Sequence, residues 1–272
     1  MFLLYKPAVA TQRTRILILC KTYPSPSANY VETSCVAGMR GDGSLVRLFP
    51  VPFRMLEEQA QFKKWQWVEA DIDKARKDHR PESYNIRLDN VQCIGDPLPT
   101  DDDWAARYRC LDKVKLFSDF ASLDQSRLDH GTTLGILPVT VPVTLEIVKA
   151  RDPVWSQEEL DKLTQHERQS GLFDKPGAES PAILEKLPYD FYYRYGPYKH
   201  KIVDWEIGAL YRNLNRSHGA DWEVPFRQKV AERLPAANLH LMLGTLHRFP
   251  DQWLIVSLIY PPKRRQGSLF HD

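Results

Sequence analysis

The sequence predicts an α+β protein, with a β-rich, barrel-like part over residues 1–150 and a smaller mixed α/β part after it. Short apolar runs bounded by Gly and Pro dominate the first part, which is typical of strands joined by turns. Helical spacing of apolar residues is concentrated in the second part. Hydrophobic residues make up 43% of the chain and aromatic residues 11%, so the chain can bury a core and is too aromatic for a disordered protein.

The first part of the chain supplies a series of strands. Residues 15–20 (RILILC) form an apolar run of strand length, and residues 67–73 alternate apolar and acidic side chains, as a half-buried strand does. Residues 31–39 and 44–49 predict a hairpin around Gly41-Asp42-Gly43. The remaining elements predicted here are a short helix over 55–64 and strands within 83–94 and 134–148.

The second part of the chain combines helices and strands around a linker. Ser156 and Glu159 form a capping box that begins a helix, and the Pro- and Gly-rich residues 170–188 predict a linker. The elements expected after it are a strand over 189–195, a helix over 204–215, a helix opened by Pro225, and paired strands over 239–246 and 253–260. The predicted domains are therefore 1–150 (β-rich), 151–188 (helix and linker), 189–262 (α+β) and 263–272 (flexible tail).

Composition excludes several classes of protein. The formal net charge is only +2, which argues against a highly basic nucleic-acid coat protein. No apolar stretch approaches the roughly 20 residues that a membrane helix needs. The four cysteines (Cys20, Cys35, Cys93 and Cys110) show no CxxC spacing, so we expect free thiols in a reducing cytoplasm. No nucleotide-binding or other cofactor motif is evident.

The last residues of the chain carry the most specific motif. Gln266-Gly267-Ser268-Leu269-Phe270 resembles the pentapeptide Gln-x-Ser/Asp-Leu-Phe with which bacterial proteins bind the DNA sliding clamp. The resemblance implies that Leu269 and Phe270 fill an apolar pocket and that Gln266 makes hydrogen bonds at its rim. The preceding Lys263, Arg264 and Arg265 would meet DNA inside the clamp or acidic clamp surface. The alternative is that Leu269 and Phe270 pack into the core of this protein.

Two aromatic and basic series suggest contact with nucleic acid. In a strand over 189–195, Tyr193 and Tyr195 share a face with Tyr189 and Phe191, and an exposed face of this kind would stack bases. Arg194 and Lys199 add charge beside it, and an ordinary core strand is the alternative. The other basic series comprises Arg40, Arg47, Arg54, Lys63, Lys64, Lys74, Arg76, Lys77 and Arg80, with Phe49 and Phe53 interleaved; its alternative is a solvated face with ion pairs.

His200, Asp204 and Glu206 form the most reactive-looking constellation. Asp204 and Glu206 could hold a divalent metal such as Mg²⁺, with His200 as a base, for phosphodiester hydrolysis. The alternative is that Asp204 caps a helix whose first turn contains Glu206. A polar cluster over residues 78–83 (DHRPES) either binds an anion or holds a bent loop.

Several strings in the chain resemble an uncharacterised bacterial protein family. They are CVAG, VRLFPVPFR, FKKWQWVEA, DHRPESY, HKIVDWE and the ending FP…W…IYPPK. The opening also resembles barrel modules of the OB type, which implies an OB-like N-terminal fold. The family resemblance implies cysteines ahead of the histidine, whereas this chain has Tyr195-Gly196-Pro197-Tyr198, so a metal site before His200 does not follow here.

The sequence supports three functions of different classes. The leading hypothesis is a cytoplasmic accessory protein of bacterial DNA metabolism or genome defence that is tethered to the sliding clamp and contacts DNA or RNA. Tethering raises the local concentration at DNA, so strong charge on the fold is not needed. The alternatives are a metal-dependent nuclease or base-processing enzyme that uses His200, Asp204 and Glu206, and a regulatory module that binds another protein through its aromatic surface.

Overall fold

The computed structural model describes residues 11–170 and 182–263, which fold into two compact units. Unit 1 comprises Met1–Pro97 and Trp155–Glu185, and unit 2 comprises Leu98–Val154 and Lys186–Asp272. The chain therefore passes from one unit to the other three times. No helix in the described ranges is long and apolar enough to cross a membrane.

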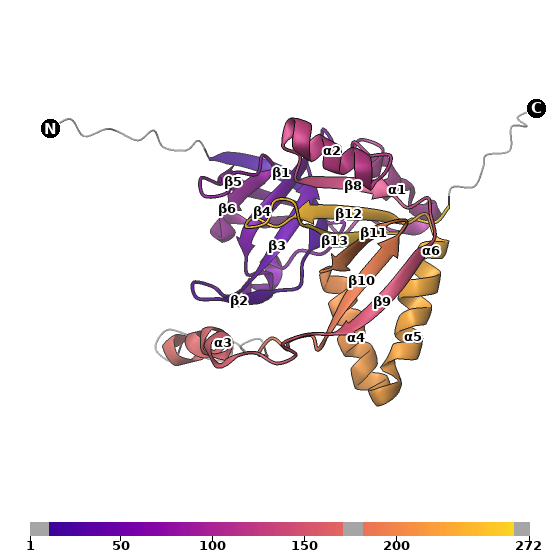
Figure 1. Ribbon diagram of the computed structural model, residues 1–272. Coiled ribbons are helices and arrows are strands. Elements are labelled where there is room, and N and C mark those ends of the chain that lie inside the picture. The colour runs from indigo at the N-terminus through magenta and orange to yellow at the C-terminus, as the bar shows by residue number, and fades with distance from the viewer. Residues whose placement is uncertain (1–10, 171–181, 264–272) are drawn as a thin grey trace, which may run out of the picture. The chain divides into compact units, whose positions relative to one another are not determined.

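Unit 1 contains a closed, OB-like barrel, which confirms the predicted fold class (Figure 1). The barrel closes because β1 pairs with both β3 and β5, and all pairs are antiparallel except β4 with β6. Two short strands extend the sheet by pairing with β3 and with β5. In spatial order the barrel strands are β1 (Gln12–Lys21), β3 (Val31–Met39), β4 (Leu45–Val51), β6 (Ser83–Ile86) and β5 (Trp67–Lys74), and the added strands are β2 (Ser25–Ser27) and β7 (Gln92–Ile94).

Period-two alternation of side chains fills the barrel. Val68, Ala70 and Ile72 of β5 are buried, whereas the residues between them are only half-buried. Gly38 lies where β3 approaches β1 most closely, because a Cβ atom at this position would come within 2.3 Å of the Leu17 carbonyl oxygen. The predicted hairpin around Gly41-Asp42-Gly43 is confirmed as the β3–β4 connection.

The predicted helix over residues 55–64 is wrong, because two single 3-10 turns, η1 (Phe53–Met55) and η2 (Glu58–Ala60), occupy this stretch. Phe53 and Phe62 are both buried, yet residues nine apart project from opposite sides of a continuous helix. The Lys21 ammonium of β1 lies 4.5 Å from the Phe53 ring centroid and 5.9 Å from that of Phe62, so the turns keep both rings beside this strand. A third turn, η3 (Leu88–Asn90), precedes β7.

The predicted capping box at Ser156 is confirmed. The Glu159 carboxylate accepts a hydrogen bond from the Ser156 backbone N–H at 2.8 Å, and Ser156 Oγ accepts one from the Glu159 N–H at 3.3 Å. The helix that follows is α3 (Gln157–Ser170), which packs against β2 and β3. Residues 155–185 belong to unit 1, whereas the sequence predicted a separate helix and linker over residues 151–188.

Unit 2 is a mixed α/β layer structure. Its strand order is β8 (Leu134–Pro138), β12 (His240–Thr245), β13 (Trp253–Ile259), β11 (Tyr198–Ile202), β10 (Tyr189–Tyr195) and β9 (Val143–Lys149). Its helical segments are α1 (Asp101–Leu111), α2 (Phe120–His130), α4 (Trp205–His218), η4 (Gly219–Trp222), α5 (Glu223–Arg227), the π turn η5 (Gln228–Arg233) and α6 (Leu234–Ala236). Phe226 of α5 packs on Phe191 of β10 with ring centroids 4.6 Å apart, in the middle of the core.

The division into units differs from the predicted domain boundary at residue 150. The strands predicted within 134–148 are β8 and β9, and their partners come from later in the chain: β8 pairs with β12, and β9 pairs with β10. Period-two patterning identifies a strand but not the strand with which it pairs. Long-range pairing therefore places residues 98–154 in unit 2.

Candidate nucleic-acid interface

The outer side of strand β4, with the loop beside it, is the candidate site in unit 1, because every residue of β3 is buried or half-buried whereas β4 exposes Phe49. In OB-type barrels, ligands bind across the second and third barrel strands and the loops beside them. Here those strands are β3 and β4, and the loop between the fourth and fifth barrel strands connects β5 to β6. On β4, Val46 and Leu48 are buried in the barrel, so Arg47 and Phe49 point outward; of these two, Phe49 is exposed and Arg47 is buried.

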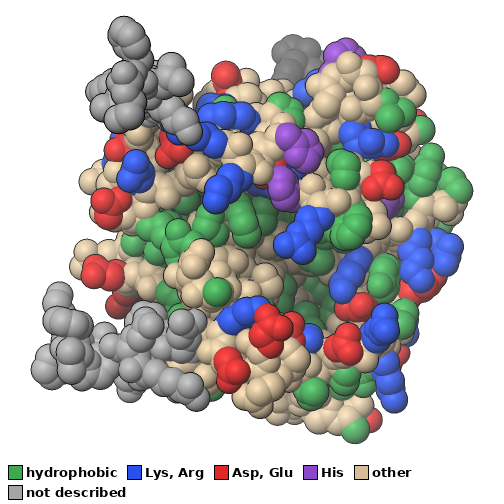
Figure 2. Space-filling model, turned by 60° about the vertical axis from the view of Figure 1, so that its left-hand side comes forward, with side chains coloured by type: hydrophobic (Ala, Val, Ile, Leu, Met, Phe, Trp, Pro, Cys, Tyr) green, Lys and Arg blue, Asp and Glu red, His purple; other side chains and the backbone are tan. Residues whose placement is uncertain are grey.

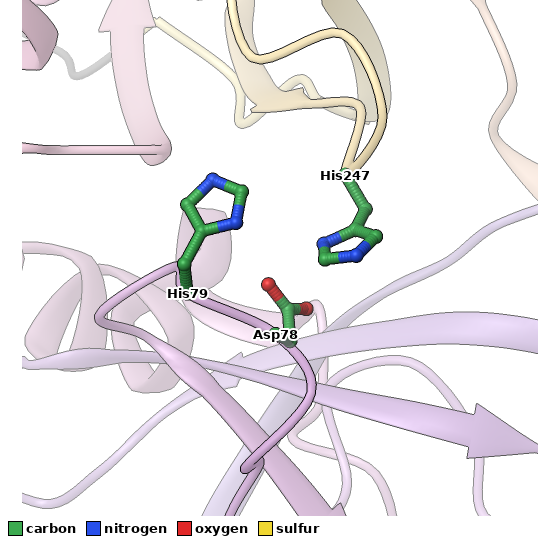
Figure 3. A group of neighbouring side chains, drawn as sticks. All are labelled: Asp78, His79 and His247. Atoms are coloured by element: carbon green, nitrogen blue, oxygen red, sulfur yellow. The ribbon is translucent and has the colours of Figure 1, made fainter.

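The β5–β6 connection, residues 75–82, is rich in basic side chains, and we call it the basic loop. Arg76, Lys77 and His79 are exposed on it. Figure 3 shows Asp78 and His79 side by side on this loop; His247, drawn in the same figure, belongs to the β12–β13 connection of unit 2. Exposed Arg and Lys side chains are of the type that binds phosphate oxygens.

Hydrogen bonds within unit 1 fix the shape of the basic loop. The Asp78 carboxylate accepts hydrogen bonds from the Arg80 backbone N–H at 3.1 Å and from the Arg80 guanidinium at 2.6 Å. The Lys74 ammonium donates to the carbonyl oxygens of Arg80 and Pro81. Burial alone would raise the pKa of Asp78, but the hydrogen bonds from Arg80 outweigh burial and hold this pKa below its ordinary value. Of the two predicted roles for residues 78–83, holding a bent loop is therefore confirmed.

Arg47 is buried, with 2% of its surface exposed, so it does not present its guanidinium as the sequence analysis expected. Its backbone N–H donates to the Glu82 carbonyl at 2.7 Å, and its guanidinium lies 3.5 Å from Ser83 Oγ. Burial lowers the pKa of Arg47, and nearby Cys35 opposes this effect. Parallel pairing of β4 with β6 sets Arg47 opposite Ser83, at the base of the basic loop, which sequence patterning does not show.

Arg54 also has a structural role in this fold. Its guanidinium forms an ion pair of 2.8 Å with Glu32, whose side chain is almost completely buried, and donates to the Ala182 carbonyl at 2.6 Å. A buried carboxylate needs such a partner, so Arg54 is held in place by Glu32. Of the other predicted contacts in unit 1, Lys63 is exposed and Lys64 is half-buried.

The predicted stacking platform on β10 is instead a core strand. Tyr193 is completely buried, and its hydroxyl donates a 2.6 Å hydrogen bond to the Val230 carbonyl in the π turn. Tyr195 is also buried, and its hydroxyl lies 2.9 Å from His200 Nδ1. The four predicted aromatic side chains do share one face, but helices cover that face, so these rings cannot stack on bases.

Arg194 and Lys199 lie on the opposite, exposed face of the same sheet. Both form ion pairs with the Glu146 carboxylate of β9, at 2.7 Å for Arg194. Their hydrogen bonds are the first cause of the lowered pKa of Glu146. Two cations that share one carboxylate leave a small local excess of positive charge. Across the face drawn in Figure 2, Lys and Arg side chains are interspersed with Asp and Glu side chains, in agreement with the low net charge.

His200, Asp204 and Glu206 do not converge on a metal site. Asp204 Oδ1 accepts the Glu206 N–H and Oδ2 accepts the Leu258 N–H, both at 2.9 Å, so Asp204 caps α4 and joins it to β13. Glu206 is exposed. In the ranges that the structure describes, no group of three metal-ligand side chains includes any of these residues. The capping alternative accounts for this constellation, because both Asp204 oxygens already bind backbone N–H groups.

His200 lies in an aromatic cluster of unit 2. The Phe120 ring centroid is 4.5 Å from that of His200, and the Tyr198 ring also packs beside it. Burial lowers the pKa of His200 to about 4, and the charge of Asp124 opposes this shift only partly. His200 is therefore a neutral packing residue at pH 7.

The predicted clamp-binding residues Gln266, Ser268, Leu269 and Phe270 lie outside the described residues, as do Arg264 and Arg265. Lys263 is exposed and is the last described residue. Clamp binding stays a prediction from the sequence.

Comparison with protein families divides the chain into two parts. Residues 12–113 match the model of a domain of unknown function, DUF8758, and residues 119–272 match the model of another, DUF8757. The curated proteins contain no match to this chain. The first match spans the barrel strands, and the second spans every strand of the unit 2 sheet.

Proposed function

We propose that this chain, which belongs to the family defined by the domain of unknown function DUF8757, is an accessory protein of bacterial DNA metabolism or genome defence. It contacts nucleic acid through the outer surface of its barrel, and its C-terminal QGSLF docks on the sliding clamp. The pre-shaped basic loop beside β3 and β4 is the observation that carries the proposal.

The basic loop favours phosphate binding for two physical reasons. Arg76 and Lys77 are exposed, and the Asp78 carboxylate, next to Lys77 in the chain, is hydrogen-bonded to Arg80. Because Asp78 and Lys74 already fix the loop backbone, binding costs less conformational entropy than it would for a free loop. Few phosphate contacts are expected from so small a charge, so affinity from the fold alone is modest.

The first prediction concerns the salt dependence of binding. Each phosphate contact contributes roughly 0.7 to 0.9 to the slope of log K against log salt, so the double variant Arg76→Ala/Lys77→Ala should lower this slope by about 1.5. Fluorescence anisotropy of a labelled oligonucleotide, titrated at several salt concentrations, measures the slope. The matched control is Lys149→Ala/Arg151→Ala, which removes one Lys and one Arg that are exposed in unit 2. Equal slopes for the two double variants would contradict the proposed interface.

The second prediction concerns the tail. Leu269 and Phe270 are the expected anchors, and removing buried anchors costs most of the affinity of a short motif. The Leu269→Ala/Phe270→Ala variant should therefore lose measurable binding to the purified sliding clamp, as should a chain that ends at Arg265. Surface plasmon resonance with the full chain as reference measures this loss. If the full chain and both variants bind the clamp equally, the tether is refuted.

A further inference from the structure

Phe49 is an exposed aromatic ring on the outer surface of the barrel. It is 44% exposed, and it alternates with the buried Leu48 along β4. An exposed Phe in isolation carries little information. This one stands on one of the two strands that form the ligand face in OB-type barrels, two residues from Arg47, which lies at the base of the basic loop.

An irregularity in strand pairing sets the direction of Phe49. Between the pairs Ser34–Val51 and Val36–Leu48, two residues of β4, Phe49 and Pro50, face a single residue of β3, Cys35. This count defines a β-bulge, which re-aims a side chain and is common beside binding sites. Pro50 donates no hydrogen bond to the ladder, so a bulge is also where a Pro is tolerated within a sheet.

The geometry points to single-stranded nucleic acid as the ligand of this surface, with an unpaired base stacked on Phe49 and the backbone on the basic loop; this inference rests on the proposed function. A ring on a sheet surface can stack only on a base whose face is open, and the bases of a duplex cover each other. The few exposed cations of the loop supply modest electrostatic attraction, so stacking is needed to raise affinity.

Affinities for matched single-stranded and duplex oligonucleotides test this inference. A labelled oligothymidylate of about 20 nucleotides and a duplex of the same length are titrated with the intact protein and its variants by fluorescence anisotropy. Stacking of one base changes affinity by about tenfold. Phe49→Ala should therefore weaken single-strand binding about tenfold and leave duplex binding unchanged, whereas Phe49→Tyr, which keeps a ring, should restore the affinity.

The matched control is Phe249→Ala, which removes another exposed Phe, 52% exposed, from the β12–β13 connection of unit 2. It should bind single strands as the unmodified protein does, and circular dichroism checks that each variant is folded. Equal affinity for duplex and single strand, or a Phe49→Ala variant that binds as tightly as the unmodified protein, overturns the inference. If the inference fails in this way but binding of both oligonucleotides still depends on Arg76 and Lys77, the proposed contact with nucleic acid survives. If neither oligonucleotide binds the protein, the inference and the proposed contact both fail.

Discussion

At the residue scale, buried polar groups have hydrogen-bond partners that their positions in the sequence do not reveal. Tyr193 is the clearest case, because its buried hydroxyl donates to the Val230 carbonyl in a π turn, where the α-helical hydrogen-bond ladder is interrupted. A buried phenol needs such an acceptor. The sequence shows a β-prone aromatic strand, but the identity of that acceptor comes only from packing between β10 and η5.

His200 makes the stability of the protein depend on pH. Burial lowers its pKa to about 4, from the ordinary histidine value of about 6.5, so on acidification the unfolded chain takes up a proton before the folded chain does. Stability is therefore complete above the unfolded pKa and falls as the pH drops from about 6.5 towards 4. Allowing for partial exposure, we expect His200 to remove about 1.5 kcal/mol of unfolding free energy between about pH 7.5 and pH 5.

Urea unfolding at the two pH values measures this effect. The His200→Phe variant, which keeps an aromatic ring in the cluster, should lose about 1.5 kcal/mol less than the unmodified protein on acidification. Burial also lowers the pKa of His240, so part of the pH dependence should remain in the variant. His130→Gln, which changes an exposed histidine, is the control. The same acid sensitivity in His200→Phe as in the unmodified protein would show that His200 is not the titrating group.

At the scale of elements, helix capping and the burial of one face of a strand decide between the roles that the sequence left open for Asp204 and for the aromatic residues of β10. Asp204 joins two elements, because its oxygens bind the first turn of α4 and the backbone of β13. Alternation along β10 places Tyr193 in the core and Arg194 in solvent. The alternating pattern by itself does not show which of the two faces of the strand is buried. Helices α4 and α5 cover the aromatic face of the sheet, which decides between them.

Asp204→Ala should destabilise the protein by about 2–4 kcal/mol, because it removes the cap of α4 and leaves the buried Leu258 N–H without its acceptor. Glu206→Ala is the control, since Glu206 is exposed, and it should change the unfolding free energy by less than about 0.5 kcal/mol. Thermal and urea unfolding measure both variants. Two equally small changes would be incompatible with a structural role for Asp204 and would reopen the metal hypothesis.

At the scale of the whole molecule, the units are not continuous segments of the chain. The chain leaves unit 1 after Pro97, returns at Trp155 and leaves again after Glu185. Two side-chain donors of the barrel part hold the returning segment: Arg54 donates to the Ala182 carbonyl and the Tyr23 hydroxyl to the Glu185 carbonyl, both at 2.6 Å. Within the segment, Trp155 Nε1 donates to the Leu184 carbonyl, also at 2.6 Å. The family matches, by contrast, divide the chain between residues 113 and 119, so α1 falls in the first match but in the second unit.

The sequence by itself determined the fold class and many of the local elements, although not the turns over residues 53–60. Alternation predicted β5, the glycine turn predicted the β3–β4 hairpin, and Ser156 with Glu159 predicted the start of α3. These features depend on neighbours within a few residues, so patterning and capping chemistry suffice to find them. The same reasoning named Arg76 and Lys77 within a basic series, but it gave no reason to separate them from Arg47 or Arg54.

Only the tertiary structure decided which of those side chains are available. Arg47 points out of the barrel yet is buried beside Ser83, the buried Glu32 holds Arg54, and Arg76 and Lys77 of the basic loop are exposed. Likewise, pairing of β8 with β12 and of β9 with β10 moved a predicted domain boundary. Burial and strand partnership depend on residues far away in the chain, and short-range patterns contain no information about which distant residues meet.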